Sequence, residues 1–295
     1  MIHKSVMLNE VIEYLKIGPK AKIIDATLNG GGHTLGLLEK YPDIKVLGIE
    51  WDPSIFQEFK SKIGDYKFEN SLIIVNDSYV DLESIVEKYD FQPSGIVFDL
   101  GLSSWHYEKS GRGFSFMRDE PLDMRFNPEK SARTAATIIN TLSEEEIEEI
   151  LRLYGEESFS KDIAKNLVKA RKNKPIMTTL ELVGVIMNSV PSWYKNRKIH
   201  PATKTFQALR VAVNGELDNV ERGVLAAINI LKSGGRLVVI SFQGLEDKIV
   251  REIFKQKARA GVIKWVIKGT VKPKWEEVKI NPRARSAKMK IIEKM

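Results

Sequence analysis

Five short apolar runs predict buried β-strands, and each run is bounded by polar or turn-forming residues. They occupy residues 22–28, 45–50, 72–76, 95–100 and 235–242. Continuous apolar runs of this length are typical of parallel strands that are covered on both faces. Helical segments alternate with the first four runs, and one of them starts at Asp52-Pro53, a good N-cap followed by proline at the first helical position. This alternation predicts a doubly wound α/β sheet.

The alternation stops after the fourth run. No strand-like run appears between about residues 125 and 200, where capping boxes at Ser143 and Thr178 instead begin two amphipathic helices. We therefore expect an all-helical domain inserted between the fourth and fifth strands. The expected division assigns residues 1–112 and 205–295 to the sheet domain and residues 113–204 to the insertion.

The last part of the chain predicts a return to the sheet. A long helical stretch is expected from about Thr203, and it ends at the corner formed by Ser233, Gly234 and Gly235. The two runs 262–270 and 286–293 are expected to pair as an antiparallel edge of the sheet.

The net charge of +7 is unevenly distributed. Fifteen Lys or Arg residues but only four acids lie between Lys248 and the C-terminus, so the rest of the chain is mildly acidic. A basic terminal region predicts a phosphate-bearing partner, although a solvated basic surface explains the charge equally well.

The sequence contains no cysteine, which excludes disulfides, thiolate metal sites and a cysteine nucleophile. Its four histidines are scattered, so no metal site is expected. Glu10 and Glu13 interrupt the apolar stretch that a signal peptide needs. We expect a cytoplasmic protein.

The loop after the first run is rich in glycine and leads into a helix, which is where open α/β sheets bind nucleotides. The dinucleotide pattern Gly-x-Gly-x-x-Gly fails here, because the third glycine would fall on Leu35, and no Walker-type phosphate loop occurs. A glycine loop without either phosphate signature favours S-adenosylmethionine. Glu50 ends the second run, where an acid accepts hydrogen bonds from ribose hydroxyls. A tight structural turn and a surface acid are the alternative.

The third and fourth runs also end in polar residues. Asp77 and Tyr79 follow the third run and are candidates to hold adenine by a hydrogen bond and by stacking. Asp99 ends the fourth run, beside a flexible turn that contains Ser103 and Ser104. A carboxylate at this position can hold and polarise an amine nucleophile with the help of either serine. Alternatively, Asp99 only caps the turn.

Several longer motifs follow one another in a fixed order. They lie at residues 31–33, 112–116, 121–125, 200–203 with 205–210, and 281–286. With these motifs the chain resembles the RsmH (MraW) family over nearly its whole length. The resemblance implies methylation of the exocyclic amine N(4) of a cytidine in the decoding region of 16S ribosomal RNA. It also implies S-adenosylmethionine as cofactor and a Rossmann-like methyltransferase sheet with an inserted all-helical domain.

The family's functional residues can be placed on matching positions of this chain. Cofactor contacts are implied for Gly31, Gly32, His33, Glu50, Tyr79, Asp99 and His106, and the strand-end argument adds Asp77. Three residues depart from the usual pattern, because Asn29 replaces glycine, His106 replaces glutamine and Gln243 replaces histidine. His106 and Gln243 either share one substrate-facing pocket, with their side chains exchanged, or are unrelated substitutions.

RNA contacts are expected from aromatic and basic side chains. The candidates are Trp105, Lys195, Arg197, Lys198, Gln243, Arg283 and Arg285. For each of them, packing or a solvated surface is the alternative. The expected partner is small-subunit ribosomal RNA, naked or within the assembled subunit, and the oligomeric state is left open.

Two other classes of protein compete with this interpretation. One is a catalytically impaired RNA-binding relative of the same fold, which would bind S-adenosylmethionine without turnover. The other is a nicotinamide oxidoreductase, against which the missing third glycine argues.

Overall fold

The computed structural model describes residues 5–64, 68 and 70–295. Contacts within the chain divide it into two compact units, Met1–Gly101 with Leu217–Met295, and Leu102–Glu216. The second unit is longer at both ends than the expected insertion, residues 113–204. The physical reason is that Leu102 and helix α11 (Ala202–Asn214) pack into the core of the helical unit.

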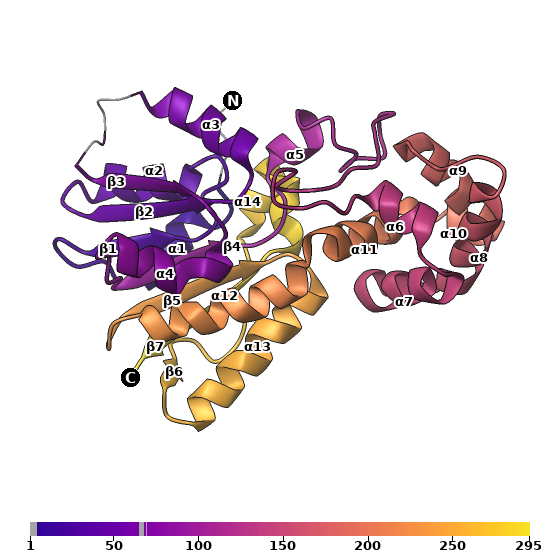
Figure 1. Cartoon of the computed structure of the whole chain (residues 1–295). Helices are drawn as coiled ribbons and strands as arrows, with labels where there is room; N and C mark the ends of the chain where they lie inside the picture. The colour runs from indigo at the N-terminus through magenta and orange to yellow at the C-terminus, as the bar shows by residue number, and fades with distance from the viewer. Residues whose placement is uncertain (1–4, 65–67, 69) are drawn as a thin grey trace. The chain divides into compact units, whose positions relative to one another are not determined.

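The first unit contains a seven-stranded sheet with the strand order β3-β2-β1-β4-β5-β7-β6 (Figure 1). Neighbouring strands are parallel except that β7 runs antiparallel to both β5 and β6. The strands are β1 (Lys22–Asp25), β2 (Lys45–Glu50), β3 (Leu72–Asn76), β4 (Gly95–Asp99), β5 (Arg236–Ser241), β6 (Ile263–Trp265) and β7 (Lys288–Lys294). The sheet confirms the predicted doubly wound fold, including the antiparallel edge.

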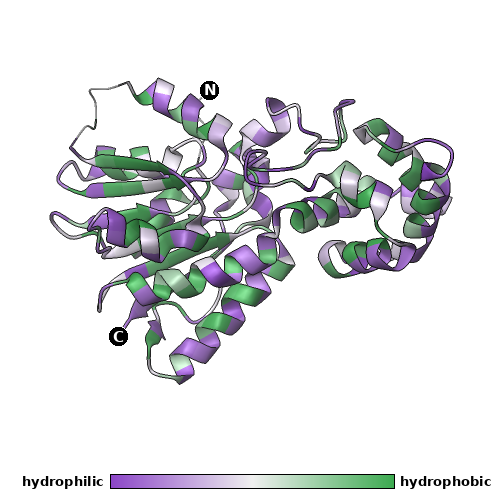
Figure 2. Ribbon diagram, in the orientation of Figure 1, coloured by the Kyte–Doolittle hydropathy of each residue, from purple (hydrophilic) through white to green (hydrophobic). Residues whose placement is uncertain are grey.

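Helices cover both faces of this sheet because its central strands are apolar on both sides. One face packs against α4 (Leu82–Lys88), α12 (Glu216–Ile230) and α13 (Gly244–Arg259). The other packs against α1 (Leu8–Leu15), α2 (Gly32–Lys40) and α14 (Trp275–Ile280). The central parallel strands are mostly hydrophobic, whereas the helices combine hydrophobic and hydrophilic residues (Figure 2).

Two short elements follow strands at the edge where the site is expected. Helix α3 (Pro53–Ile63) begins after β2, and the side chain of its N-cap Asp52 accepts a hydrogen bond from the Ser54 N–H. The 3-10 helix η1 (Tyr79–Asp81) follows β3.

The second unit is helical and has its own apolar core. Its helices are α5 (Ser104–Glu108), α6 (Ala135–Thr141), α7 (Glu144–Gly155), α8 (Ser160–Arg171), α9 (Thr179–Ser189), α10 (Ser192–Lys195) and α11. The capping boxes at Ser143 and Thr178 begin α7 and α9 as predicted. The expected long helical stretch after Thr203 is two helices, because Gly215 takes a left-handed conformation (φ 60°) that ends α11 before α12 begins.

In the described part of the chain, no helix is both long enough and apolar enough to span a membrane.

Candidate active site

Three carboxyl groups lie at the ends of β1, β2 and β4, where parallel strands meet one edge of the sheet. Asp25, Glu50 and Asp99 are all buried, with 0%, 6% and 8% of their surface exposed. Burial raises the pKa of each carboxyl above its ordinary value, because the charged form loses its hydration. Perturbed acids gathered at the ligand edge of an α/β sheet are typical of a functional site.

The glycine loop between β1 and α2 depends on backbone conformations that few residues adopt. Asn29 and Gly31 both have positive φ, 50° and 76°. The left-handed conformation suits asparagine at the position where the resembled family has glycine. A β-carbon on Gly31 would lie 1.9 Å from a ring carbon of Phe59, so this position requires glycine for space as well. Gly32 begins α2, so the loop presents a helix N-terminus to this edge.

The side chain of Glu50 is held by a hydrogen bond from a nearby backbone N–H. Its Oε1 accepts a hydrogen bond from the Asp52 N–H at 2.8 Å. Burial raises the pKa of Glu50 to about 8, and the nearby charges of Asp52 and Asp25 add to the effect. Its carboxyl is therefore mostly neutral at pH 7 in the cofactor-free protein, and hydroxyl donors would favour its charged form.

Asp99 has one carboxyl oxygen with a neighbour and one without. Its Oδ2 lies 3.7 Å from Nδ1 of His33, while its Oδ1 is buried and has no hydrogen-bond partner among the described residues. The Asp99 N–H donates to the hydroxyl of Thr27 at 2.6 Å, which fixes the end of β4 against the glycine loop. Burial raises the pKa of Asp99 to about 6, although the nearby His33 lowers it. A buried oxygen without a partner marks a place where a ligand donor fits.

Asp25 is a member of this cluster that the sequence did not single out. Its Oδ2 accepts a hydrogen bond from the Thr34 hydroxyl at 2.7 Å, and its Oδ1 accepts one from the Thr27 N–H at 3.3 Å. Asp25 therefore ties β1 to the first turn of α2 and shapes the loop between them. The available signal was its place at the end of the first apolar run.

The candidates for adenine lie after β3. Asp77 accepts a hydrogen bond from the Ser78 N–H at 3.0 Å. The Tyr79 ring packs edge-on against Phe98, with centroids 5.4 Å apart. It also lies so close to α12 that a β-carbon on Gly223 would be 2.4 Å from it. Tyr79 is thus partly used in packing, and its stacking on adenine stays a prediction.

The remaining catalytic and cofactor candidates belong to the second unit and form the start of α5. Ser103 is the N-cap, and its N–H donates to Nδ1 of His106 at 3.2 Å. His106 is buried, and its ring contacts those of Phe114 and Phe126, which stack on each other. Ser104 follows as the first residue of α5. These contacts give His106 a local structural role, and the functional roles of the three residues stay predictions.

The RNA candidates are mostly exposed. Arg197 lies over the rings of Trp193 and Tyr194, at 5.6 and 5.2 Å, and Trp193 is 62% exposed. Trp105 is half-buried with Arg112 over its ring. The others are Lys195, half-buried; Lys198, Arg283 and Arg285, exposed; and Gln243, half-buried at the start of α13. This placement is compatible with RNA contacts, which stay predictions.

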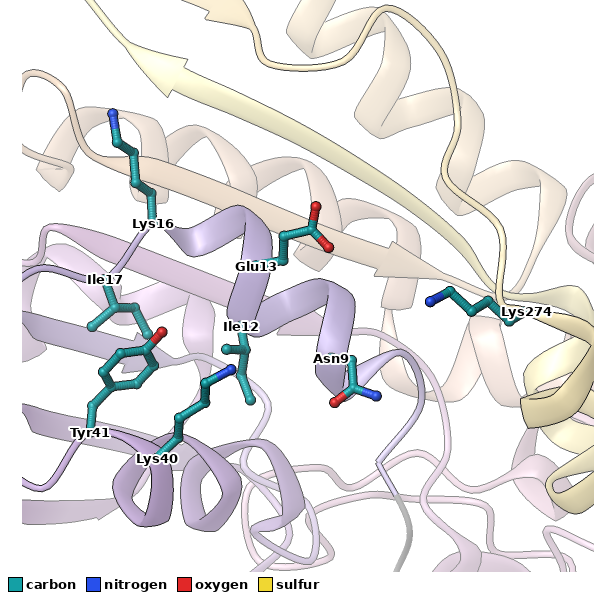
Figure 3. Close-up of a pocket in the computed structure, with 8 residues that line it drawn as sticks. All are labelled: Asn9, Ile12, Glu13, Lys16, Ile17, Lys40, Tyr41 and Lys274. Carbon is teal, nitrogen blue, oxygen red and sulfur yellow. The ribbon is translucent and has the colours of Figure 1, made fainter.

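A separate hollow of about 610 Å³ lies beside α1 (Figure 3). Lys40 and Lys274 extend toward α1 from either side of it. Its lining residues are Asn9, Ile12, Glu13, Lys16, Ile17, Lys40, Tyr41 and Lys274. None of the predicted cofactor residues lines it, and it adjoins the C-terminal end of α2, whereas the glycine loop precedes the N-terminal end.

The sheet with its reversed β7, the glycine loop after β1 and the acids at the strand ends define an S-adenosylmethionine-dependent methyltransferase. The residues present fit this cofactor, since the glycine loop leads into the N-terminus of α2 and the buried carboxyl of Glu50 at the end of β2 can accept hydrogen bonds from ribose hydroxyls.

The chain belongs to the MraW methylase family, whose model matches residues 1–295. Two relatives, from Persephonella marina and Dictyoglomus thermophilum, are named ribosomal RNA small subunit methyltransferase H. They are 40% and 43% identical to this chain, and the matches cover 99% of it and 99% and 97% of the relatives. This membership decides against the nicotinamide oxidoreductase.

Among solved structures, an rRNA methylase from Streptococcus thermophilus is similar at 11% identity and a TM-score of 0.44. The match covers 98% of this chain and 93% of that one.

Proposed function

We propose that the protein transfers a methyl group from S-adenosylmethionine to N(4) of a cytidine in the decoding region of 16S ribosomal RNA, in the cytoplasm. Full-length identity of about 40% to enzymes named for small-subunit ribosomal RNA methylation supports the substrate. The observation that carries the chemistry is Oδ1 of Asp99 at the end of β4, which is buried and has no hydrogen-bond partner in the described part of the chain.

S-adenosylmethionine supplies a methyl group activated by its sulfonium. The new N–C bond forms as the C–S bond breaks, so the amine must lie in line with the breaking bond and about 3–3.5 Å from the methyl carbon. The lone pair of a cytidine amine is delocalised into its ring, which makes the amine a weak nucleophile. Asp99 accepts a hydrogen bond from the amine, which lets the nitrogen become pyramidal, and then accepts the proton that the methylated amine loses.

The base must reach the buried carboxylate, so the target cytidine is single-stranded or flipped out of its stack. Ser103 or Ser104 assists in holding the amine, and Trp105 stacks on the base. Gly31, Gly32, His33, Glu50, Asp77, Tyr79 and His106 hold the cofactor, and basic side chains of both units contact RNA phosphates.

The test is Asp99→Asn and Asp99→Ala, assayed by transfer of a labelled methyl group to small-subunit ribosomal RNA. Both variants should stay folded and lose about 10²–10⁴-fold in turnover, which is typical for a lost proton acceptor. The control is Asp81→Asn, an exposed aspartate of the same unit. Near-normal turnover of Asp99→Ala would make this residue a structural cap. Binding of S-adenosylmethionine by the unaltered protein without turnover would favour the catalytically impaired relative.

A further inference from the structure

The segment before α1 joins two parts of the first unit that are far apart in sequence. The Met7 N–H donates to Oε1 of Glu277, in α14, at 2.7 Å. The preceding carbonyl, that of Val6, lies 2.9 Å from Nε2 of His33, in α2. The single peptide group between Val6 and Met7 therefore connects helix α14 to the cofactor loop, because its N–H contacts Glu277 and its carbonyl contacts His33.

Met7 adopts an unfavourable backbone conformation at this junction. Its φ and ψ are 56° and 34°, in the left-handed region, and its side chain is fully buried. A residue other than glycine or asparagine in this region costs on the order of 1–2 kcal/mol. Such a turn persists only where its surroundings fix it, and the hydrogen bond to Glu277 supplies such a restraint.

The contact with Val6 also determines which nitrogen of the His33 ring carries a hydrogen. A carbonyl oxygen only accepts hydrogen bonds, so Nε2 of His33 must carry a hydrogen. Nδ1 is then the nitrogen that faces Oδ2 of Asp99, at 3.7 Å. The Val6 carbonyl thus orients the imidazole toward the carboxyl group that we assign to catalysis.

Charged groups from three elements act on Asp99. His33 from α2 is the positive neighbour when it is protonated, and Asp25 from β1 and Glu277 from α14 are the negative ones. Glu277 is half-buried. Its negative charge disfavours the ionised form of Asp99 and so raises the pKa of that carboxyl.

We propose that Glu277 is a positioning residue for methyl transfer. It holds the Val6–Met7 turn that orients His33 toward Asp99, and its charge makes the Asp99 carboxylate a stronger proton acceptor. This inference rests on the role of Asp99 in the proposed function.

Glu277→Gln and Glu277→Ala separate the two effects. The glutamine variant keeps an oxygen that can accept the Met7 N–H but loses the charge, whereas the alanine variant loses both. Glu276→Gln is the matched control, because Glu276 is the exposed neighbour on the same helix. The measurements are the melting temperature and the pH profile of kcat/KM for methyl transfer to small-subunit ribosomal RNA.

Glu277→Gln should melt like the unaltered protein, while the acid limb of its profile moves to lower pH. Glu277→Ala should show the same shift of the acid limb. Its kcat should be about tenfold lower than that of Glu277→Gln, because the Val6–Met7 turn no longer orients His33. If the acid limb of Glu277→Gln does not shift, the proposal is wrong, and Glu277 serves only to stabilise the N-terminal segment through its hydrogen bond with the Met7 N–H. If Glu277→Ala does not fold, the glutamine variant still decides. Full activity of Asp99→Asn would instead refute the proposed function, whatever Glu277 does.

Discussion

Glu50→Gln isolates the ionisation of one buried carboxyl. The glutamine side chain has nearly the same shape, and its amide oxygen can still accept the hydrogen bond that Glu50 Oε1 receives from the Asp52 N–H. What the substitution removes is the ability of this buried group to become charged.

The size of the effect follows from the pKa of Glu50, which burial raises from 4.5 to about 8. Between these two values the folded protein binds more protons than the unfolded chain, so its stability falls as pH rises. The fall is about 1.4 kcal/mol per pH unit in this window, and it stops above the folded pKa. At pH 7 the cofactor-free protein has therefore lost about 3 kcal/mol that Glu50→Gln retains.

The assay is thermal and denaturant unfolding without cofactor at pH 5, 6, 7 and 8. We expect Glu50→Gln to exceed the unaltered protein by about 1 kcal/mol or less at pH 5 and by increasing amounts up to pH 8. A difference of 3 kcal/mol corresponds to about 5 °C at this chain length. The control is Glu39→Gln, an exposed glutamate on α2. Parallel stability curves for Glu50→Gln and the unaltered protein would refute the assignment of a raised pKa.

The same substitution should weaken binding of S-adenosylmethionine. Hydrogen bonds from ribose hydroxyls to a carboxylate are worth about 1.5–3 kcal/mol, so calorimetry should show about a 10- to 150-fold loss of affinity. Binding to the charged form requires Glu50 to lose its proton. The affinity of the unaltered protein should therefore rise with pH up to about 8, and that of Glu50→Gln should not.

Two further outcomes test the loop and the RNA surface. Gly31→Ala should unfold at lower temperature and bind the cofactor weakly, because its φ of 76° and the Phe59 ring both oppose a β-carbon; normal binding by calorimetry would contradict this geometry. Neutralising Lys198, Arg283 and Arg285 together should flatten the dependence of RNA affinity on salt by roughly one unit of slope per lost phosphate contact, and an unchanged slope would place the RNA surface elsewhere.

The sheet could be predicted because its signals are local. Each parallel strand is a continuous apolar run, and topology then brings the residues at the carboxyl ends of these runs together. For that reason Glu50 and Asp99 could be named as site residues from the sequence, and the structure places both at one edge. Asparagine and glycine are also the residue types that most readily adopt the left-handed backbone found at positions 29 and 31.

Other features depend on tertiary contacts that no local pattern reveals. The partner of the Met7 N–H is 270 residues away, and the packing of Tyr79 depends on a glycine in α12. The boundary between the two units depends on which of the two apolar cores Leu102 and α11 pack into. Apolar side chains can pack into either core, so the sequence alone does not reveal this boundary. These features follow from the fold as a whole.

The paired departures at His106 and Gln243 lie at the starts of two different helices, α5 and α13. A Ser-x-x-Gln sequence forms a capping box, in which glutamine accepts the N-cap N–H. At the start of α5, Nδ1 of His106 accepts the Ser103 N–H in the same way. At the start of α13, Oε2 of Glu246 accepts the Gln243 N–H at 3.1 Å, whereas the buried Oε1 of Gln243 has no hydrogen-bond partner among the described residues.

We therefore expect His106→Gln and Gln243→His to act independently. His106→Gln should preserve the start of α5, and Gln243→His should preserve that of α13. Effects on turnover, converted to free energies, should then add to within about 0.5 kcal/mol in the double variant, as they do for residues that share no partner. The measurement is methyl transfer by the four proteins of this cycle. If each single reversion impairs turnover and the double reversion restores it, the two side chains serve one pocket and do not act independently.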